Sequence, residues 1–178
     1  MVPAEQVIAR LRERGQSLST CESLTAGLLA ATLAEVPGAS AVLRGGLITY
    51  ATDLKERLAG VEKQTLVEHG PVSAETAAEM AAGARRVCGS DWALSLTGVA
   101  GPEPQDGHPV GEVFLGLARP DGSRRVVRVK REGKMRYALS SHESVPVAVL
   151  VGGRTQIRSW AVAAALELIH GELGENGE

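Results

Sequence analysis

The chain has 178 residues, 44% of them hydrophobic, and a net charge of −2, which suits one soluble globular domain and argues against nucleic-acid binding through bulk charge. No apolar run approaches the roughly 20 residues of a membrane span, and the first residues are spaced as in an amphipathic helix, unlike a signal peptide. Two cysteines and four histidines, without disulfide-framework or metal-ligand spacing, predict a cytoplasmic protein that lacks a metal site.

Apolar periodicity predicts alternating helices and strands. The expected elements are a helix over 4–14, a strand over 17–21, a helix over 26–35, a strand over 42–50, a helix over 74–87, strands over 92–97, 112–118 and 125–131, and a helix over 154–170. Ser73 is expected to cap the third helix, and the turn "RPDG" predicts a hairpin. The order predicts an α/β fold, a three-layer α/β/α sandwich with a mixed, partly parallel sheet.

The chain reads as one domain over residues 1–172, followed by a frayed polar tail over residues 173–178. Residues 133–153 fit this scheme least well, because a polar Ser-Ser-His-Glu-Ser cluster precedes an apolar run. We interpret them as an excursion loop followed by an edge strand.

The first candidate site is "CESLTAG", where a strand turns sharply into a helix. Backbone amides at such turns lack partners and point outward, and α/β folds bind ligands there. Ser23 and Thr25 supply hydroxyl groups, and Gly27 allows close approach of a ligand. Two interpretations stay open for this segment: a side chain that caps the helix, or a nucleophile.

The second candidate site is residues 44–60. Gly46, with the glycine before it, interrupts a strand and indicates a bulge or a close backbone approach. Tyr50 ends the strand, and Lys55 follows at the start of a short helix. Taken alone, Tyr50 is equally a strand aromatic with a hydrated hydroxyl, and Lys55 a solvated charge.

Two further segments carry candidate binding residues. Thr97 and Gly98 end an apolar strand and begin a Gly- and Pro-rich loop, which could wrap a phosphate or a sugar or be a generic surface loop. Arg154 and Arg158 lie four residues apart at a helix start and share one face. They could clamp a phosphate or form surface ion pairs.

Seven segments in order combine into a more specific pattern: CESLTAG, VPGAS, GGLITYATDLK, GPVSAE, SLTGVAGP, HPVG and RTQIR. The set resembles the C-terminal domain of the CinA family of competence-damage-inducible proteins, the nicotinamide mononucleotide deamidases. The match is close over residues 19–116 and resumes at 152–170. Each segment alone is weakly specific, and the ordered set is strongly so.

The resemblance implies an amidohydrolase that converts nicotinamide mononucleotide to nicotinate mononucleotide and ammonia, without a cofactor, in pyridine-nucleotide (NAD) recycling. It implies Ser23 as nucleophile, Tyr50 and Lys55 as its partners and Thr97 at the substrate. It also implies a stand-alone domain, whereas many relatives carry an additional N-terminal domain, and a homo-oligomer. The expected partner is a small-molecule nucleotide, with no nucleic acid and no membrane.

Amide hydrolysis needs an activated nucleophile, a proton shuttle and donors for the oxyanion. We expect helix-start amides near residues 25–27 to hold the oxyanion and Lys55, alone or through Tyr50, to move the proton. Either burial lowers the pKa of Lys55, or Lys55 stays cationic and orients Tyr50 and the oxyanion. The residues expected to contact substrate are Thr25, Gly27, Gly46, Thr97, Gly98 and Arg154.

The chain departs from the family pattern at several positions. Leu24 replaces a cysteine, Thr52 replaces an asparagine, and Ala26 replaces a glycine, which predicts strain if that position needs a positive φ. The loop "GPEPQDGHPVG" lacks consecutive glycines. Two alternatives therefore remain: a catalytically degenerate nucleotide-binding or interaction domain, and an amidohydrolase that acts on another small amide.

Overall fold

A five-stranded mixed sheet forms the middle layer of the molecule, which a computed structural model describes for residues 2–175. The strand order is β2-β1-β3-β4-β5, with bounds β1 Leu18–Glu22, β2 Leu43–Ile48, β3 Trp92–Gly98, β4 Val113–Ala118 and β5 Arg124–Arg128. Strand β1 is parallel to both β2 and β3, whereas β4 is antiparallel to β3 and β5. The parallel pairs follow helical crossovers, as predicted.

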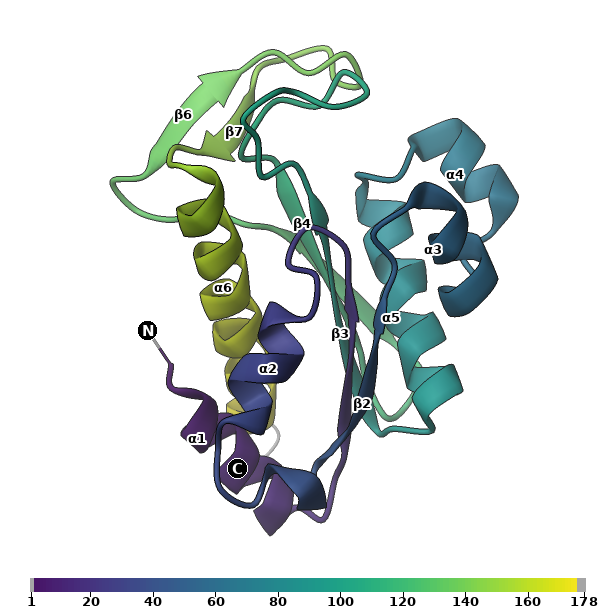
Figure 1. The fold of residues 1–178 in the computed structure, drawn as a ribbon, viewed down its shortest axis with the longest axis vertical. Coiled ribbons are helices and arrows are strands. Elements are labelled where there is room, and N and C mark those ends of the chain that lie inside the picture. Colours follow the sequence, from purple (N-terminus) through teal and green to yellow (C-terminus); the bar gives the residue numbers. More distant parts are fainter. Residues whose placement is uncertain (1, 176–178) are drawn as a thin grey trace.

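Helices cover both faces of this sheet (Figure 1). One face carries α1 (Ala4–Glu13), α2 (Leu28–Ala34) and α6 (Arg154–Glu175), and the other carries α3 (Thr52–Ala59), α4 (Lys63–His69) and α5 (Ala74–Cys88). A short 3-10 helix, Ala39–Ala41, precedes β2. The predicted three-layer sandwich is thereby confirmed.

Small residues allow the layers to pack closely in a chain with only 3% aromatic residues. Gly116 of β4 lies directly under α5, where an added Cβ would be 2.2 Å from the carbonyl oxygen of Ala77. No side chain fits such a gap, so glycine is required at this contact. The central strands β1 and β3 are buried almost throughout, as expected for strands covered on both faces.

Three local predictions are also confirmed. The Ser73 hydroxyl accepts a hydrogen bond from the Thr76 amide at 3.1 Å and caps α5. The turn between β4 and β5 places Gly122 at φ +86°. The pairing of β2 with β1 shifts register before Ser19, so a bulge lies beside the Gly45–Gly46 pair.

Residues 133–153 differ from the prediction, which was an excursion loop and an edge strand. They form a separate antiparallel hairpin, β6 (Met135–Ala138) with β7 (Val147–Leu150), which pairs with no strand of the main sheet. Buried Val149 and Leu150 hold it against the body of the molecule, and the Leu150 amide donates to the carbonyl of Gly111. The apolar run was therefore a buried strand, but its partner is β6.

The tail prediction was wrong for residues 173–175, because α6 continues to Glu175 and Leu173 is buried. Arg10 and Arg14 of α1 donate to the carbonyl oxygens of His170 and Leu173, which ties α1 to the last turns of α6. Residues 176–178 lie outside the described part of the chain. Between residues 2 and 175, no helix has the length and apolar character needed to cross a membrane.

Candidate active site

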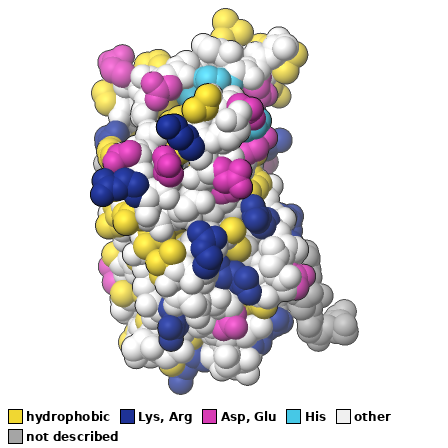
Figure 2. Space-filling view, turned by 90° about the vertical axis from the view of Figure 1, so that its right-hand side faces the viewer, with side chains coloured by type: hydrophobic (Ala, Val, Ile, Leu, Met, Phe, Trp, Pro, Cys, Tyr) yellow, Lys and Arg dark blue, Asp and Glu magenta, His cyan; other side chains and the backbone are white. Residues whose placement is uncertain are grey.

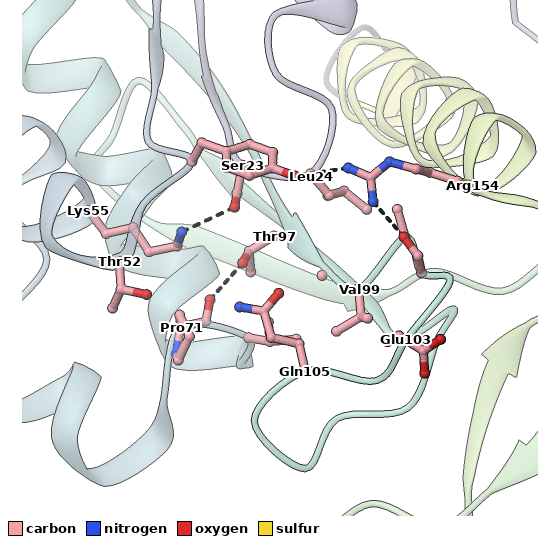
Figure 3. Close-up of a pocket in the computed structure, with 15 residues that line it drawn as sticks. Ser23, Leu24, Thr52, Lys55, Pro71, Thr97, Val99, Glu103, Gln105 and Arg154 are labelled. Atoms are coloured by element: carbon pink, nitrogen blue, oxygen red, sulfur yellow. Dashed lines mark hydrogen bonds between the residues drawn. The ribbon is translucent and has the colours of Figure 1, made fainter.

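A cavity of about 100 Å³ opens at the carboxyl ends of the parallel strands, where α/β sheets bind ligands (Figure 3). Ser23 follows β1, Tyr50 follows β2, and Thr97 lies near the end of β3. Lys55 enters from α3 and Arg154 from the first turn of α6. The fold thus brings together candidate residues from five separate elements.

Ser23 and Lys55 are in direct contact. The Lys55 Nζ donates to the Ser23 Oγ at 3.1 Å and to the Thr49 carbonyl oxygen at 2.8 Å. Lys55 is only 2% exposed and Ser23 is 9% exposed. The structure therefore places an amine within hydrogen-bond reach of a hydroxyl group, which is the geometry of a Ser–Lys nucleophile and base.

Burial changes the protonation of Lys55. Desolvation of the ammonium group lowers the pKa of Lys55 from 10.5 to about 8, and an electrostatic contribution from Cys21 opposes part of this shift. Freeing the amine at pH 7 then costs about 1.4 kcal/mol, compared with roughly 5 kcal/mol for an exposed lysine. Burial thus lowers the pKa of Lys55, as the first of its two predicted roles requires.

A buried carboxylate, which sequence reasoning missed, caps α2. The Glu22 oxygens accept hydrogen bonds from the amides of Gly27, Leu29 and Ala30 at 2.8–3.0 Å. The N-cap residue of α2 is Gly27, which has no side chain and so cannot itself cap the helix. The alternative that a serine or threonine caps α2 is therefore wrong. An acidic residue directly before such a turn was the available signal.

This capping corrects the predicted oxyanion site, because the Gly27 amide already donates to Glu22. The amides of Leu24 and Thr25 have no protein acceptor within residues 2–175. Arg158 donates to the carbonyl oxygens of the same two residues at 3.0 and 2.9 Å and so holds the turn in place. Arg158 is thus committed to the turn and lies outside the cavity lining.

Ala26 adopts a positive φ of 50°, a conformation that favours glycine. The predicted strain at this departure from the family pattern is therefore present. Ala26 lies two residues beyond Leu24, within the turn that Glu22 and Arg158 hold through hydrogen bonds.

Tyr50 and Arg154 pair with each other across the cavity. The Tyr50 hydroxyl accepts a hydrogen bond from Arg154 Nη2 at 2.8 Å, and Arg154 Nη1 donates to the Gly101 carbonyl. Tyr50 is 55% exposed and forms no hydrogen bond with Ser23 or Lys55 in the described part of the chain. The expected relay of a proton through Tyr50 therefore has no support in this geometry.

The remaining predicted residues fall into two groups. Thr97 and Gly98 line the cavity, and the buried Thr97 hydroxyl donates to the Pro71 carbonyl at 2.6 Å. Thr25, Gly27 and Gly46 do not line it. Gly46 instead faces β1, where an added Cβ would lie 2.3 Å from the Thr20 hydroxyl oxygen, so its small size serves strand packing.

The loop between β3 and β4 supplies two polar side chains that sequence reasoning did not single out. Glu103 and Gln105 both line the cavity, and Figure 3 shows the Gln105 carboxamide pointing into it from below Thr97. Only the glycine and proline content of this loop had marked it as a candidate. Thr52, at the start of α3, also lines the cavity.

A second cavity of about 310 Å³ shares Val72 with the first. It lies where acidic and histidine side chains gather, toward the upper end of the face formed by α3, α4 and α5 in Figure 2. Its one serine, Ser73, is committed to capping α5, and His108 pairs with Glu112 at 2.8 Å. No three His, Cys, Asp or Glu side chains between residues 2 and 175 are placed to hold a metal ion.

The chain is similar in sequence to known proteins. A family model described as the CinA C-terminal domain matches residues 2–149. A CinA-like protein of Frankia casuarinae is 44% identical over 163 residues, which is 92% of this chain and 33% of that protein. The chain thus spans about a third of the length of the curated relatives it matches.

Solved structures show the same fold. A competence/damage inducible protein, CihA, from Agrobacterium tumefaciens is 33% identical with a TM-score of 0.78, over 96% of this chain and 93% of that one. A CinA superfamily protein from Klebsiella pneumoniae is 27% identical with a TM-score of 0.83, over 97% and 96%. On its family match, its identity to a curated relative and its fold, this chain belongs to the CinA family, through the CinA C-terminal domain.

Proposed function

We propose that the protein hydrolyses the carboxamide of nicotinamide mononucleotide to give nicotinate mononucleotide and ammonia. The observation that carries this proposal is the hydrogen bond between Lys55 Nζ and Ser23 Oγ inside the cavity. A base in contact with a serine hydroxyl is what acyl transfer requires. The substrate itself comes from the family resemblance, and Arg154 offers an anion-binding group at a distance from the serine.

In the first half-reaction, neutral Lys55 takes the Ser23 hydroxyl proton as Oγ attacks the carboxamide carbon. The amide of Leu24, a residue that lines the cavity, is the proposed donor to the resulting oxyanion. Lys55 then gives its proton to the departing nitrogen. The C–N bond breaks, ammonia leaves, and an ester joins the nicotinoyl group to Ser23.

In the second half-reaction, Lys55 takes a proton from water, and the hydroxide oxygen attacks the ester carbon. The C–Oγ bond breaks, and Ser23 recovers the proton from Lys55. The product acid gives its own proton to the released ammonia or to water and leaves as its carboxylate. The protein groups end as they began, so the cycle requires only water and the amide.

The direct test is ammonia release from nicotinamide mononucleotide by the native protein and by Ser23→Ala. We expect stoichiometric ammonia and nicotinate mononucleotide from the native protein alone. Because the mechanism requires no metal, a chelator should leave turnover unchanged. If folded native protein at high concentration releases no ammonia above the blank, the proposal is wrong, and the degenerate binding domain becomes the better interpretation.

The size of the cavity supports one alternative, hydrolysis of an amide smaller than the mononucleotide, and this alternative can be tested. Its volume of about 100 Å³ lies below the roughly 300–1,000 Å³ typical of small-molecule sites, so part of a nucleotide bound at Ser23 would extend beyond it. Nicotinamide and nicotinamide riboside therefore belong in the same assay, and a preference for either over the mononucleotide would assign the protein to another small amide.

A further inference from the structure

The second cavity, of about 310 Å³, is lined by a buried histidine that the proposed function does not use. His108 is 3% exposed, and its Nδ1 lies 2.8 Å from a carboxylate oxygen of Glu112. Because that carboxylate accepts the hydrogen bond, Nδ1 carries the hydrogen and the neutral ring presents a lone pair at Nε2. Within residues 2–175, no group forms a hydrogen bond with this Nε2. Buried polar atoms without a partner are uncommon in native proteins, so a bound donor is expected there.

The ring of His108 is held in one orientation. Glu112 fixes its edge and also pairs with Arg128 at 3.2 Å. The face of the ring stacks on His142, with the ring centroids 4.1 Å apart and the planes 9° apart. The His142 Nε2 lies in turn 2.7 Å from the carbonyl oxygen of Asp106. An acceptor fixed by its neighbours in this way is preorganised for a ligand.

The charge of the cavity wall favours a cation. Four glutamates and one arginine line the cavity, so negative charge prevails while the histidines are neutral. The arginine is already paired with two of the glutamates. The other two, Glu68 and Glu75, lie 3.9 and 3.8 Å from His69, which balances their charge only when it is protonated. Figure 2 shows acidic and histidine side chains gathered at the upper end of this face, where the field of the wall attracts positive charge.

We propose that this cavity binds an aliphatic ammonium ion, with one N–H of the ligand donating to Nε2 of His108. A volume of about 310 Å³ lies within the range typical of small-molecule sites. Apolar side chains supply surface for the carbon chain of the ligand: Val72, Ala74 and Phe114. In a diamine, the second ammonium group would lie among the exposed glutamates of the wall. The ligand class is therefore an aliphatic amine or diamine in its protonated form.

The experiment titrates the native protein with 1,4-diaminobutane in a calorimeter at pH 8 and uses 1,4-butanediol as an uncharged control of the same length. We expect the diamine to bind and the diol not to bind. His108→Asn keeps an N–H near the Nδ1 position for Glu112 and removes the Nε2 acceptor. This variant should bind the diamine about 10-fold more weakly, as for the loss of one hydrogen bond to a charged group.

A matched pair of surface variants measures the contribution of the wall. Glu75 lines the cavity, whereas Glu56 is an exposed carboxylate of α3 that does not line it. Glu75→Gln should weaken binding of the diamine about 3-fold, and Glu56→Gln should change it less than about 1.5-fold. Equal losses in the two variants would mean diffuse attraction to an acidic surface and would overturn the inference, even if His108→Asn does not fold.

The Nε2 resonance of His108 in long-range ¹H–¹⁵N spectra locates the ligand, and it should move in proportion to occupancy as the diamine is added. Ser23→Ala should bind the diamine as the native protein does, because neither Ser23 nor Lys55 lines this cavity. Failure of the proposed function would therefore leave these results unchanged. An unmoved Nε2 resonance, no binding of the diamine, a diol that binds as tightly, or equal affinity in folded His108→Asn would each overturn the inference.

Discussion

Lys55 is the residue at which stability and the proposed catalytic role conflict. Its ammonium group is buried and desolvated, so its pKa falls from 10.5 to about 8. Because the folded-state pKa lies below the unfolded one, the destabilisation is fully present below pH 8 and is lost as pH rises toward 10.5. The charged side chain thus lowers the free energy of unfolding at neutral pH. The same burial lowers the pKa of the amine that contacts Ser23.

The first prediction concerns the stability that this lysine removes. Lys55→Met should raise the free energy of unfolding at pH 7 by up to about 3 kcal/mol, less the two hydrogen bonds lost, and abolish turnover. Denaturant unfolding at pH 7 and pH 10 measures the effect. The gain should shrink at the higher pH, and a gain independent of pH would contradict the assigned cause.

The second prediction is a pH profile. If neutral Lys55 is the base, kcat/KM should rise about tenfold per pH unit below pH 8 and level off above it, with an apparent pKa of about 8. Initial rates between pH 6 and 9.5 test this directly. A rate that falls as pH passes 8 would mean that the cationic lysine is the active form.

The third prediction couples the two catalytic residues. Ser23→Ala and Lys55→Ala should each cut kcat by several orders of magnitude, because members of one catalytic unit act together. The double variant should be little worse than either single variant. Losses that multiply would show that the residues act independently, and an active Ser23→Ala protein would remove the nucleophile altogether.

At the scale of elements, the turn between β1 and α2 joins a stabilising cap to a strained residue. Glu22 satisfies three amides of α2 while Ala26 sits at φ +50°. The strand, the turn and the helix therefore share one small region, and their geometries are not independent. Changes to the cap and to the strain should have opposite effects on stability.

The fourth prediction uses this opposition. Ala26→Gly should raise the free energy of unfolding by about 1 kcal/mol, because glycine adopts a positive φ without steric cost. Glu22→Gln should lower it by about 1–3 kcal/mol, because a buried charge-assisted cap is lost. Thermal unfolding with matched turnover assays measures both, and a destabilised Ala26→Gly protein would contradict the strain assigned to this turn.

Elements with clear periodicity were predictable, and pairings between distant segments were not. The strand around Leu94 is a mainly apolar run bounded by polar turns, so local pattern sufficed to place it. The partner of Val149 in β6 depends on contacts that no local pattern encodes, and the sequence interpretation placed this strand at a sheet edge. Helix α4 is only seven residues long and carries a weak apolar pattern, so it was missed.

The same distinction applies to the site. The order of motifs was enough to bring Ser23, Lys55 and Thr97 to one end of the sheet, because parallel strands share their carboxyl edge. An acidic residue before the turn was a signal for the Glu22 cap, but the carbonyls that Arg158 holds could not be predicted from sequence, because this side chain could equally have faced solvent. The two arginines of α6 share a helix face but take different partners 50 or more residues away.

At the scale of the whole molecule, the candidate site and the contact between α1 and the last turns of α6 lie at opposite edges of the sheet. The cavity opens at the carboxyl edge, whereas α1 and the last turns of α6 meet at the other end (Figure 1). Helix α6 connects these two edges. Its first turns carry Arg154, which lines the cavity, and Arg158, which holds the turn after β1. Its last turns contact α1. This one helix spans both ends of the molecule.

The contact between α1 and the end of α6 has a practical consequence. Since α1 lies against the last turns of α6, a flexible linker long enough to run the length of α1, roughly 15 Å, could join residue 2 to residue 175, and new ends could be opened in the exposed turn around Gly122. Such a circularly permuted protein should keep the kcat of the native one. By the same geometry, a solid support attached next to residue 175 would lie on the side of the sheet away from the candidate site, which would face the solution.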